Sequence, residues 1–556
     1  MSALLPGLTR HNLGTEILAG ITLLAISLPL NIGYAQIAGL PPAAGLYALV
    51  LPSLVFALLA SSRHLVAAPD AAASALVGSA LAGVAVAGTE QYVAMAAAQA
   101  IVGGVMFVLC SVFRLGFLAD FLSKPILVGF VAGLAVDILL GQTAKMLGIS
   151  LPRGVDFPER LVTLLGNLES VHYWSLGLGL GVLAVLVAGR AWLPKVPWAL
   201  IVLIAATAAS VALHLPGHGV AVLGQLPSGP PSLGLPTLDW HLWVAVILPA
   251  LAITTVSMGE GLLVARSYSD KYDYRTSPNR DLLAFGGANL AAGLSSGFTI
   301  GSATSRAAAM DHAGSRTQLP MVILAGGALL LLLFGADLLA DIPTPAIGAI
   351  VAVSVVKLIS IAELRHLWRL SRFESLVALT CLFGVLLVGP LAGIVLAFIL
   401  SLINLLRKAA RPAIDLLEGS EDPHVTLGVA HADAGETVPG VIAMRFAAPI
   451  FFGNAQTLST AIRDSVRRAP NPVSAFILDM EGVTDVDVTG AEALAKELQW
   501  LQGNGITFAY TRVRPQLMDN LGRMGLLQGH KVFHTNRAAV AELRPDSATQ
   551  PETKSS

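Results

Sequence analysis

Long apolar runs separated by short polar turns fill the chain from residue 14 to residue 408. We place these runs at 14–33, 42–60, 70–87, 91–113, 119–141, 173–189, 196–214, 241–263, 280–293, 302–313, 319–340, 343–359, 373–389 and 390–408. A helix needs about 20 apolar residues to cross a bilayer, and most of these runs approach that length. The pattern therefore predicts a polytopic helical membrane protein with fourteen spans, two of them short.

The pattern changes abruptly after Arg411-Pro412. Strand-like runs at 438–446, 473–479 and 506–510 alternate with helical runs at 454–468, 489–503 and 514–526. This alternation is typical of a small α/β domain. We therefore divide the chain into an N-terminal segment (1–13), a transmembrane domain (14–411), a linker with a first strand (412–437), an α/β domain (438–544) and a polar tail (545–556), which we expect to be disordered.

Composition agrees with the membrane prediction. Hydrophobic residues make up 55% of the 556 residues and charged residues only 12%, and the mean hydropathy is +0.73. The net charge of −1 gives no reason to expect a nucleic-acid partner. The two cysteines, Cys110 and Cys381, lie in apolar runs and cannot form a disulfide framework. The apolar run that begins at Ile17 has no credible signal-peptide cleavage site, so we expect the first span to stay in the protein.

Basic residues indicate the orientation. Cytoplasmic loops carry an excess of Lys and Arg, and with the N-terminus inside, the turns on that side contain Arg10, Arg63, Arg114, Lys124, Arg190, Lys195, Arg266, Lys271, Arg275, Arg280, Arg316, Arg365, Arg369, Arg372, Arg407, Lys408 and Arg411. The outer connection from His214 to Trp240 has none, whereas a loop with Lys145, Arg153 and Arg160 goes against the trend. We predict that both termini face the cytoplasm, in a bacterial-type inner membrane. Glu16, Glu90 and Asp120 lie at span ends, where we expect them to be solvated.

One polar stretch stands out among the apolar runs. Gly293-Leu-Ser-Ser-Gly-Phe-Thr-Ile-Gly-Ser-Ala-Thr-Ser-Arg306 is rich in glycine and hydroxyl groups. We predict a short extended piece from Gly297 to Gly301, and a helix of about ten residues capped by Ser302. Interrupted backbone at membrane depth is tolerated where it lines a cavity, and the N-terminus of a half-helix in that cavity attracts anions. The alternative is a polar loop at the membrane surface.

The first half of the chain repeats this feature. His64-Leu-Val-Ala-Ala68 is extended in character, and Pro69 is suited to the first position of a helix. Each interrupted helix is the third of seven. Interrupted segments in corresponding positions of two halves are a strong pointer to a transporter's binding site.

Three stretches carry a resemblance to a known family. The first is Leu18-Ala-Gly-Ile with Leu28-Pro29 and Gly33-Tyr34-Ala-Gln-Ile-Ala-Gly-Leu-Pro41-Pro42-Ala-Ala-Gly45-Leu-Tyr47. The second is Ser305-Arg306 after the glycine-rich strand, together with Asp311 to Thr317. The third is Asp479-Met-Glu-Gly-Val-Thr-Asp-Val-Asp487-Val-Thr489-Gly490. The chain thus resembles the sulfate permease (SulP) family of anion transporters, and the third stretch is similar to the core of a STAS domain. The resemblance implies a seven-plus-seven inverted repeat with a core and a gate domain, a cytoplasmic STAS domain and a homodimer.

The resemblance also implies substrate-binding residues: Tyr34, Pro69, Asp70, Ala71, Ser302, Ala303, Thr304, Ser305 and Arg306. Ser305 matches the serine that contacts substrate in the family, and Arg306 matches a basic residue that would attract the anion. The alternative for Arg306 is a side chain that snorkels to the cytoplasmic surface, and for Tyr34 it is ordinary packing. Many members have Gln after the first-span proline, whereas this chain has Leu30 and then Asn31, so the match fails there.

Two carboxyl groups are candidates for ion coupling. Glu260 lies within an apolar span, and acidic residues of this segment are associated with coupling ions in the family. Sodium-dependent relatives tend to have oxygen ligands one turn further on, where this chain has Val264, so protons are favoured over sodium. Asp70 is either a partner of its helix dipole or a carboxylate that faces the site.

No cofactor motif, metal cluster or catalytic triad stands out, and we expect no enzyme, no cofactor and no metal site. Thr489 either caps the helix that begins there or is a regulatory phosphorylation site. We therefore predict a secondary transporter that carries a small anion by proton symport, with sulfate as the first candidate substrate. The alternatives are bicarbonate or dicarboxylate transport, an uncoupled anion channel, and a membrane sensor whose output is the STAS-like domain.

Overall fold

The computed structural model describes residues 5–116, 124–152, 155–193, 196–227, 229–418, 428–429 and 435–544. The chain forms two compact units, Met1–Ser401 and Leu402–Ser556. The predicted disordered tail (545–556), most of the linker and Asp120 lie outside the described residues.

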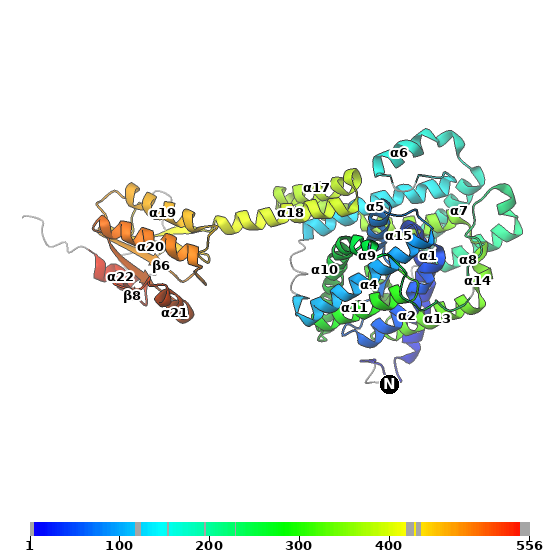
Figure 1. Cartoon of the computed structure of the whole chain (residues 1–556), viewed down its shortest axis with the longest axis horizontal. Helices are drawn as coiled ribbons and strands as arrows, with labels where there is room; N and C mark the ends of the chain where they lie inside the picture. Colours follow the sequence, from blue (N-terminus) through cyan, green and yellow to red (C-terminus); the bar gives the residue numbers. More distant parts are fainter. Residues whose placement is uncertain are drawn as a thin grey trace, which may run out of the picture. The chain divides into compact units, whose positions relative to one another are not determined.

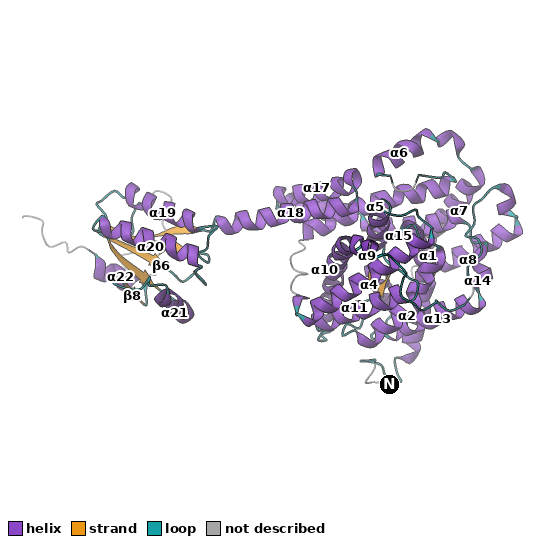
Figure 2. Ribbon diagram, viewed as in Figure 1, coloured by secondary structure: helices purple, strands orange, loops and turns teal. Residues whose placement is uncertain are grey.

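The first unit is a bundle of helices (Figures 1 and 2). Each predicted apolar segment overlaps a helix, namely α1 (Leu13–Ile37), α2 (Pro42–Leu59), α3 (Ala71–Leu81), α4 (Glu90–Val112), α5 (Lys124–Leu147), α7 (Tyr173–Trp192), α8 (Trp198–Ala212), α10 (Ile247–Tyr272), α11 (Pro278–Leu294), α12 (Thr304–His312), α13 (Leu319–Phe334), α15 (Thr344–Val355), α17 (Arg372–Val388) and α18 (Pro390–Ala410). Eight helices in the described ranges are long and apolar enough to cross a membrane. The chain is a multi-pass membrane protein, and the count of fourteen crossings stays a prediction.

Four helices were not among the predicted segments, or form separate short pieces of them: α6 (Phe157–Gly166), α9 (Trp240–Ala245), α14 (Ala336–Ala340) and α16 (Ile361–Leu370). Helix α16 carries Arg365 and Arg369 with the exposed Trp368, and its Glu363 forms an ion pair of 2.9 Å with Lys124. The sequence pattern failed here because each of these helices is shorter than a span.

Small residues bring the helices close together. On α4 and α11, a Cβ at Gly104 would lie 2.8 Å from the backbone nitrogen of Leu290, and one at Gly286 would lie 3.0 Å from the carbonyl oxygen of Gly104. Such contacts exclude any side chain, and close backbone approach through small residues is how membrane helices pack. This packing holds α11 firmly, and α11 leads directly into the glycine-rich stretch.

The second unit contains a six-stranded sheet of order β4-β3-β5-β6-β7-β8. The strands are β3 (Ile414–Glu418), β4 (Gly428–Val429), β5 (Val441–Phe446), β6 (Ala475–Asp479), β7 (Thr507–Thr511) and β8 (Lys531–Phe533). Strands β5 to β8 are parallel and β3 and β4 are antiparallel. The continuous apolar runs of β5 and β6 are buried on both faces, as parallel strands covered by helices require.

The helices of this unit are α19 (Ala455–Arg468), α20 (Val488–Gly503), α21 (Pro515–Arg523) and α22 (Asn536–Leu543). The three predicted strands and three predicted helices are all present. Strands β4 and β8 and helix α22 were not predicted, because the two strands are only two and three residues long and α22 is only weakly apolar.

Candidate functional site

Two short strands bring the interrupted segments together. Strand β1 (Ala67–Ala68) pairs antiparallel with β2 (Gly301–Ser302), with Ala67 opposite Ser302. The backbone N–H of Ala303 extends the pairing by donating to the carbonyl of Val66 at 2.9 Å. Each strand leads directly into a short helix, α3 or α12. Because the strands are antiparallel, the two helices run apart and their N-termini meet at the strand pair.

Helix α3 begins differently from the prediction. It starts at Ala71, and its N-cap is Asp70, whose Oδ1 accepts a hydrogen bond of 2.7 Å from the backbone N–H of Ala73. The prediction that Pro69 opens the helix was therefore wrong: Pro69 lies outside the helix and precedes its cap. A carboxylate at this position satisfies free N–H groups and complements the helix dipole. Asp70 therefore has the first of the two predicted roles, that of a partner of its helix dipole.

Helix α12 begins without such a cap. The predicted cap, Ser302, is wrong, because Ser302 lies in β2 with its backbone committed to the strand pair; the N-cap is Ala303, which has no side-chain oxygen. The hydroxyl of Ser302 is buried and has no hydrogen-bond partner within the described residues. Thr304 and Ser305, in the first turn, are exposed. Within the described residues, the first N–H groups of α12 are consequently free to donate hydrogen bonds to an external ligand.

Helix α10 packs against the back of the strand pair. Gly301 is required there, because a Cβ would overlap the Asp70 carboxylate and would lie 2.9 Å from the hydroxyl of Ser257. Glu260, one turn beyond Ser257, is partly buried. It lies close enough to Asp70 for the two carboxyl groups to interact electrostatically. The structure therefore brings both predicted coupling candidates to the same strand pair.

Arg306 is buried under the start of α12, with 1% of its surface exposed. Its Nη1 donates to Oδ1 of Asn31 at 2.6 Å, and its Nη2 donates to the carbonyl oxygen of Pro69. Nε has no partner in the described part of the chain. The interpretation of Arg306 as a snorkelling residue was wrong, because neutral acceptors from α1 and from Pro69, before α3, hold it inside the bundle.

Tyr34 and Asn31 complete this region from α1. The guanidinium carbon of Arg306 lies 5.9 Å from the centroid of the Tyr34 ring, within the range of a cation–π contact, and Tyr34 is 5% exposed. Asn31 is fully buried and also donates to the carbonyl of Gly45 at 3.3 Å. Asn31 was not among the predicted site residues. A buried amide in an apolar span was the signal that it missed.

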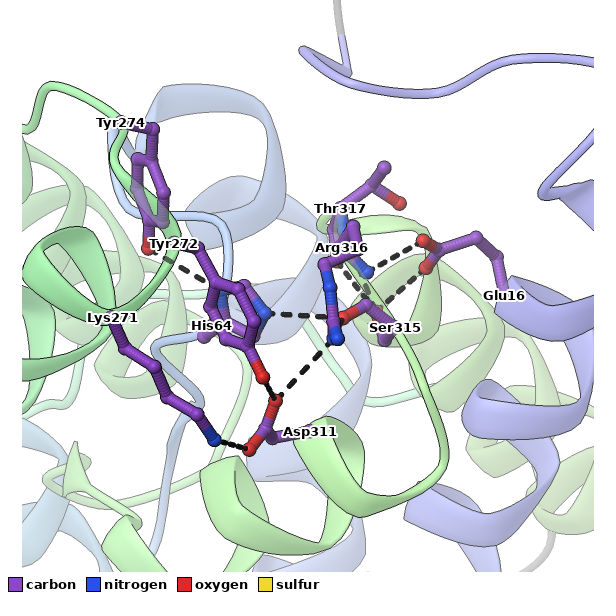
Figure 3. A network of polar contacts seen from close by, with 9 residues as sticks. All are labelled: Glu16, His64, Lys271, Tyr272, Tyr274, Asp311, Ser315, Arg316 and Thr317. Atoms are coloured by element: carbon purple, nitrogen blue, oxygen red, sulfur yellow. Dashed lines mark hydrogen bonds and ion pairs between the residues drawn. The ribbon is translucent and has the colours of Figure 1, made fainter.

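A polar network fixes the far end of α12 (Figure 3). Asp311 accepts hydrogen bonds from Lys271 at 2.7 Å and from the hydroxyl of Tyr272. Glu16 accepts from the hydroxyl of Ser315 at 2.6 Å and from the backbone N–H of Arg316 at 2.7 Å. The expectation that Glu16 is solvated was wrong, because its side chain is completely buried and binds these donors. Glu90 is exposed, as expected.

His64 joins the same network from the loop before β1. It is buried, with Nε2 3.1 Å from the carbonyl oxygen of Ser315 and Nδ1 3.3 Å from the hydroxyl of Tyr274. A carbonyl only accepts, so the hydrogen is on Nε2, and Nδ1 accepts from Tyr274. Burial lowers the pKa of His64 to about 4, which keeps the ring neutral. The network thus ties the loop before β1 to the turn after α12.

Thr489 does not cap its helix. The cap of α20 is Asp487, whose Oδ1 accepts from the N–H of Gly490 at 2.6 Å, and Thr489 is exposed in the first turn. The capping interpretation of Thr489 was therefore wrong. Thr489 lines a polar cavity of about 390 Å³ between α19 and α20, together with Arg463 and Lys496.

The fold and the site define a class: a multi-pass helical protein in which two half-helices meet inside a bundle, joined to an α/β domain. A family model described as the sulfate permease family matches residues 13–381, and a STAS domain model matches residues 435–539. The chain belongs to the sulfate permease family and carries a C-terminal STAS domain.

Known relatives and structures agree over nearly the whole chain. A probable sulfate transporter from Mycobacterium tuberculosis is 34% identical over 542 residues, which are 96% of each chain. Sulfate transporter 3.1 from Arabidopsis thaliana is 28% identical and covers 94% of this chain and 83% of its own length. The murine Slc26a9 anion transporter in its inward-facing state has the same fold, with a TM-score of 0.89, 19% identity and coverage of 98% of this chain and 94% of that one. The transmembrane domain of the cyanobacterium bicarbonate transporter BicA has a TM-score of 0.58 and 22% identity to this chain. The match covers 71% of this chain and 98% of that domain.

Proposed function

We propose that this chain is a secondary active transporter of a small oxyanion, with sulfate as the first candidate. In this proposal the oxyanion binds at the N-terminus of α12. The names of its relatives support transport of such an anion, since proteins of 34% and 28% identity are called sulfate transporters. The observation that carries the proposal is the uncapped start of α12 beside a buried guanidinium that binds only neutral acceptors among the described residues.

The two half-helices contribute unequally in this proposal. Asp70 occupies the N-terminus of α3 as its cap, whereas the N–H groups of Thr304 and Ser305 have no intrahelical acceptor. An oxyanion there takes the place of the missing cap and accepts hydrogen bonds from these N–H groups and from the Ser305 hydroxyl. The positive end of the helix dipole adds about 0.3–1 kcal/mol. Donors without formal charge suit a ligand that must bind and then leave.

Asp70 opposes an anion when it is charged, and this points to coupling. Its carboxylate lies against Gly301, and Glu260 is close enough to interact with it. Proton binding by this pair would remove negative charge as the anion enters. We therefore propose proton symport with Glu260 as the principal proton carrier, and a homodimer in the inner membrane with both termini in the cytoplasm.

Uptake of radiolabelled sulfate into proteoliposomes tests the proposal, with an imposed pH gradient and bicarbonate, dicarboxylates and chloride as competitors. Ser305→Leu should fold normally, because Ser305 is exposed, and substitutions of exposed side chains usually change the free energy of unfolding by about 0.5 kcal/mol or less. It should abolish uptake, because the leucine side chain covers the free N–H groups. Ser305→Ala keeps those N–H groups and should retain most of the uptake. Normal kinetics in Ser305→Leu would exclude the α12 site.

A further inference from the structure

A long apolar groove lies on the first unit, away from the strand pair. It has a volume of about 680 Å³ and is bounded by α5, α7 and α15, which pack against one another. On α7 the lining residues Leu176, Leu180, Leu183 and Val187 recur every three or four positions. Residues at this spacing share one face of a helix. One apolar face of α7 therefore forms the length of the groove.

The other two helices contribute almost no polar surface. Leu139 and Met146 line the groove from α5, and Val353 lines it from α15. The hydroxyl of Thr143 is also in the lining, but it donates to the carbonyl of Leu139 at 2.8 Å. The described residues that line the groove thus provide no free hydroxyl group, and a polar solute would lose its hydration there without compensation.

Two cations line the groove, each at the C-terminal end of its own helix. Arg190 lies near the C-terminus of α7, and Lys357 follows the C-terminus of α15; both line the groove. Neither has an ion-pair partner in the described ranges of the chain, although Arg190 is partly buried. A partly buried guanidinium without a carboxylate is open to an anionic group from outside the chain.

The groove is long enough to hold an acyl chain that spans one leaflet of a bilayer. From Leu176 to Arg190 the helical rise of about 1.5 Å per residue gives a length of about 21 Å, more than the ~15 Å that half of a hydrocarbon core measures. Leu180 and Val187 remain 50% and 57% exposed, so the groove is open at the side of the bundle. Under the orientation predicted from the positive-inside rule, the C-terminal ends of α7 and α15, with the two cations, face the cytoplasmic leaflet.

We infer that this groove binds an anionic phospholipid of the cytoplasmic leaflet, with an acyl chain along the leucine face of α7 and the phosphate between Arg190 and Lys357. The inference concerns a lipid site and is independent of which anion the protein transports. Basic groups between membrane helices on this side recognise anionic headgroups, and the apolar wall explains why the ligand also carries a hydrocarbon chain. A soluble anion would use the cations but not the groove.

Native mass spectrometry of the full-length protein in a neutral detergent tests the inference. The probe is an equimolar mixture of phosphatidylglycerol and phosphatidylcholine with identical acyl chains. The wild-type protein should retain phosphatidylglycerol several-fold more than phosphatidylcholine. Arg190→Gln/Lys357→Gln should reduce this ratio to about one, and the exchanged pair Arg190→Lys/Lys357→Arg should restore it, because both charges remain. Leu180→Trp, at a half-exposed position, should lower retention of both lipids because it fills the groove.

The control is Arg365→Gln/Arg369→Gln, which removes two cations from α16 that do not line the groove. This variant should keep the wild-type ratio. An unchanged ratio in the Arg190/Lys357 glutamine variant would overturn the site, and so would an equal loss in the control. Equal retention of the two lipids by the wild-type protein would overturn the anionic headgroup. Thermal unfolding of each variant establishes that it is folded, and the Leu180→Trp result tests the groove even where the double variant fails to fold.

Discussion

Arg306 and Asn31 are joined by a hydrogen bond of 2.6 Å from Nη1 to Oδ1, across 275 residues of sequence. The bond connects the short helix α12 to the first helix of the chain, α1. Both side chains are buried. Because Asn31 is neutral, it satisfies the guanidinium without cancelling its positive charge. The pair therefore fixes the position of Arg306 without neutralising it, and the charged group that interacts with the guanidinium is the Asp70 carboxylate.

Two substitutions of Asn31 separate these effects. Asn31→Ala leaves a charged donor unpaired, which should reduce the free energy of unfolding by about 1.5–3 kcal/mol and reduce uptake. Asn31→Asp keeps an acceptor and should keep most of the stability, but it adds a negative charge beside Arg306. We expect a raised KM for sulfate in Asn31→Asp, measured in proteoliposomes, with thermal unfolding in detergent as the measure of stability. An unchanged KM in Asn31→Asp would mean that the anion does not sense the charge of Arg306.

The sequence predicted the helices and strands of this site better than the long-range hydrogen bonds between them. Apolar runs are decided by local composition, so the helices and the strand–helix alternation of the second unit were predictable. The glycine-rich stretch also marked the site correctly. Asn31 and Glu16 were missed or misjudged because their partners, Arg306 and Ser315, lie far away in the sequence.

The two capping errors have a similar cause. Ser302 and Pro69 both have the local chemistry of a helix start, but Ser302 is paired within β2, and Pro69 directly follows the paired residue Ala68 of β1. The helices therefore begin one or two residues later, at Thr304 and Ala71. Long-range pairing outweighs local preference here, and a single sequence does not reveal it.

His64 should make the stability of the protein depend on pH. Burial lowers its pKa in the folded state to about 4, below the ordinary value of about 6.5. The unfolded chain therefore binds the proton first, and the stabilisation is complete above pH 6.5 and is lost as the pH falls towards 4. The slope is at most about 1.4 kcal/mol per pH unit. Melting temperatures between pH 6.5 and 5 should fall more steeply for the wild-type protein than for His64→Gln.

The charged groups around His64 determine the control for this experiment. Asp311, Arg316 and Lys271 lie in the same network (Figure 3) and are retained in His64→Gln, so their own titration is common to both proteins. His366 is exposed on α16, and His366→Gln should keep the wild-type slope. If both glutamine variants show the wild-type slope, His64 does not carry the pH dependence.

Truncation after Arg411 tests the division of labour between the two units. Every proposed ligand group, from Asn31 to Arg306, lies in the unit Met1–Ser401. The truncated protein should therefore bind sulfate with a Kd within about threefold of the full-length value, a difference below 1 kcal/mol. Its transport rate or assembly is expected to fall. Complete loss of sulfate binding in a folded, truncated protein would show that the STAS domain takes part in the site.

Coupling to protons is tested at Glu260. In the proposed cycle the neutral form of Glu260 accompanies the anion, and the charged form cannot return alone, because charge in a membrane interior is costly. Glu260→Gln removes the titration and keeps the size of the side chain. It should abolish accumulation driven by an acid-outside gradient, while exchange of labelled for unlabelled sulfate continues, since exchange needs no net proton movement.

Asp70→Asn is the matched variant, because Asp70 caps α3 through the N–H of Ala73 and lies near the same pair of strands. Asparagine also caps helices well, so this variant should fold with a loss of stability of a few tenths of a kcal/mol, up to about 1 kcal/mol. If Asp70 acts only as a cap, the Asn variant should still concentrate sulfate under a pH gradient, and Glu260→Gln should not. The reverse result, with accumulation lost in Asp70→Asn and retained in Glu260→Gln, would assign the proton to Asp70. Accumulation in both single variants would leave neither carboxyl group as the necessary carrier, and the proton-symport proposal would then fail at this site.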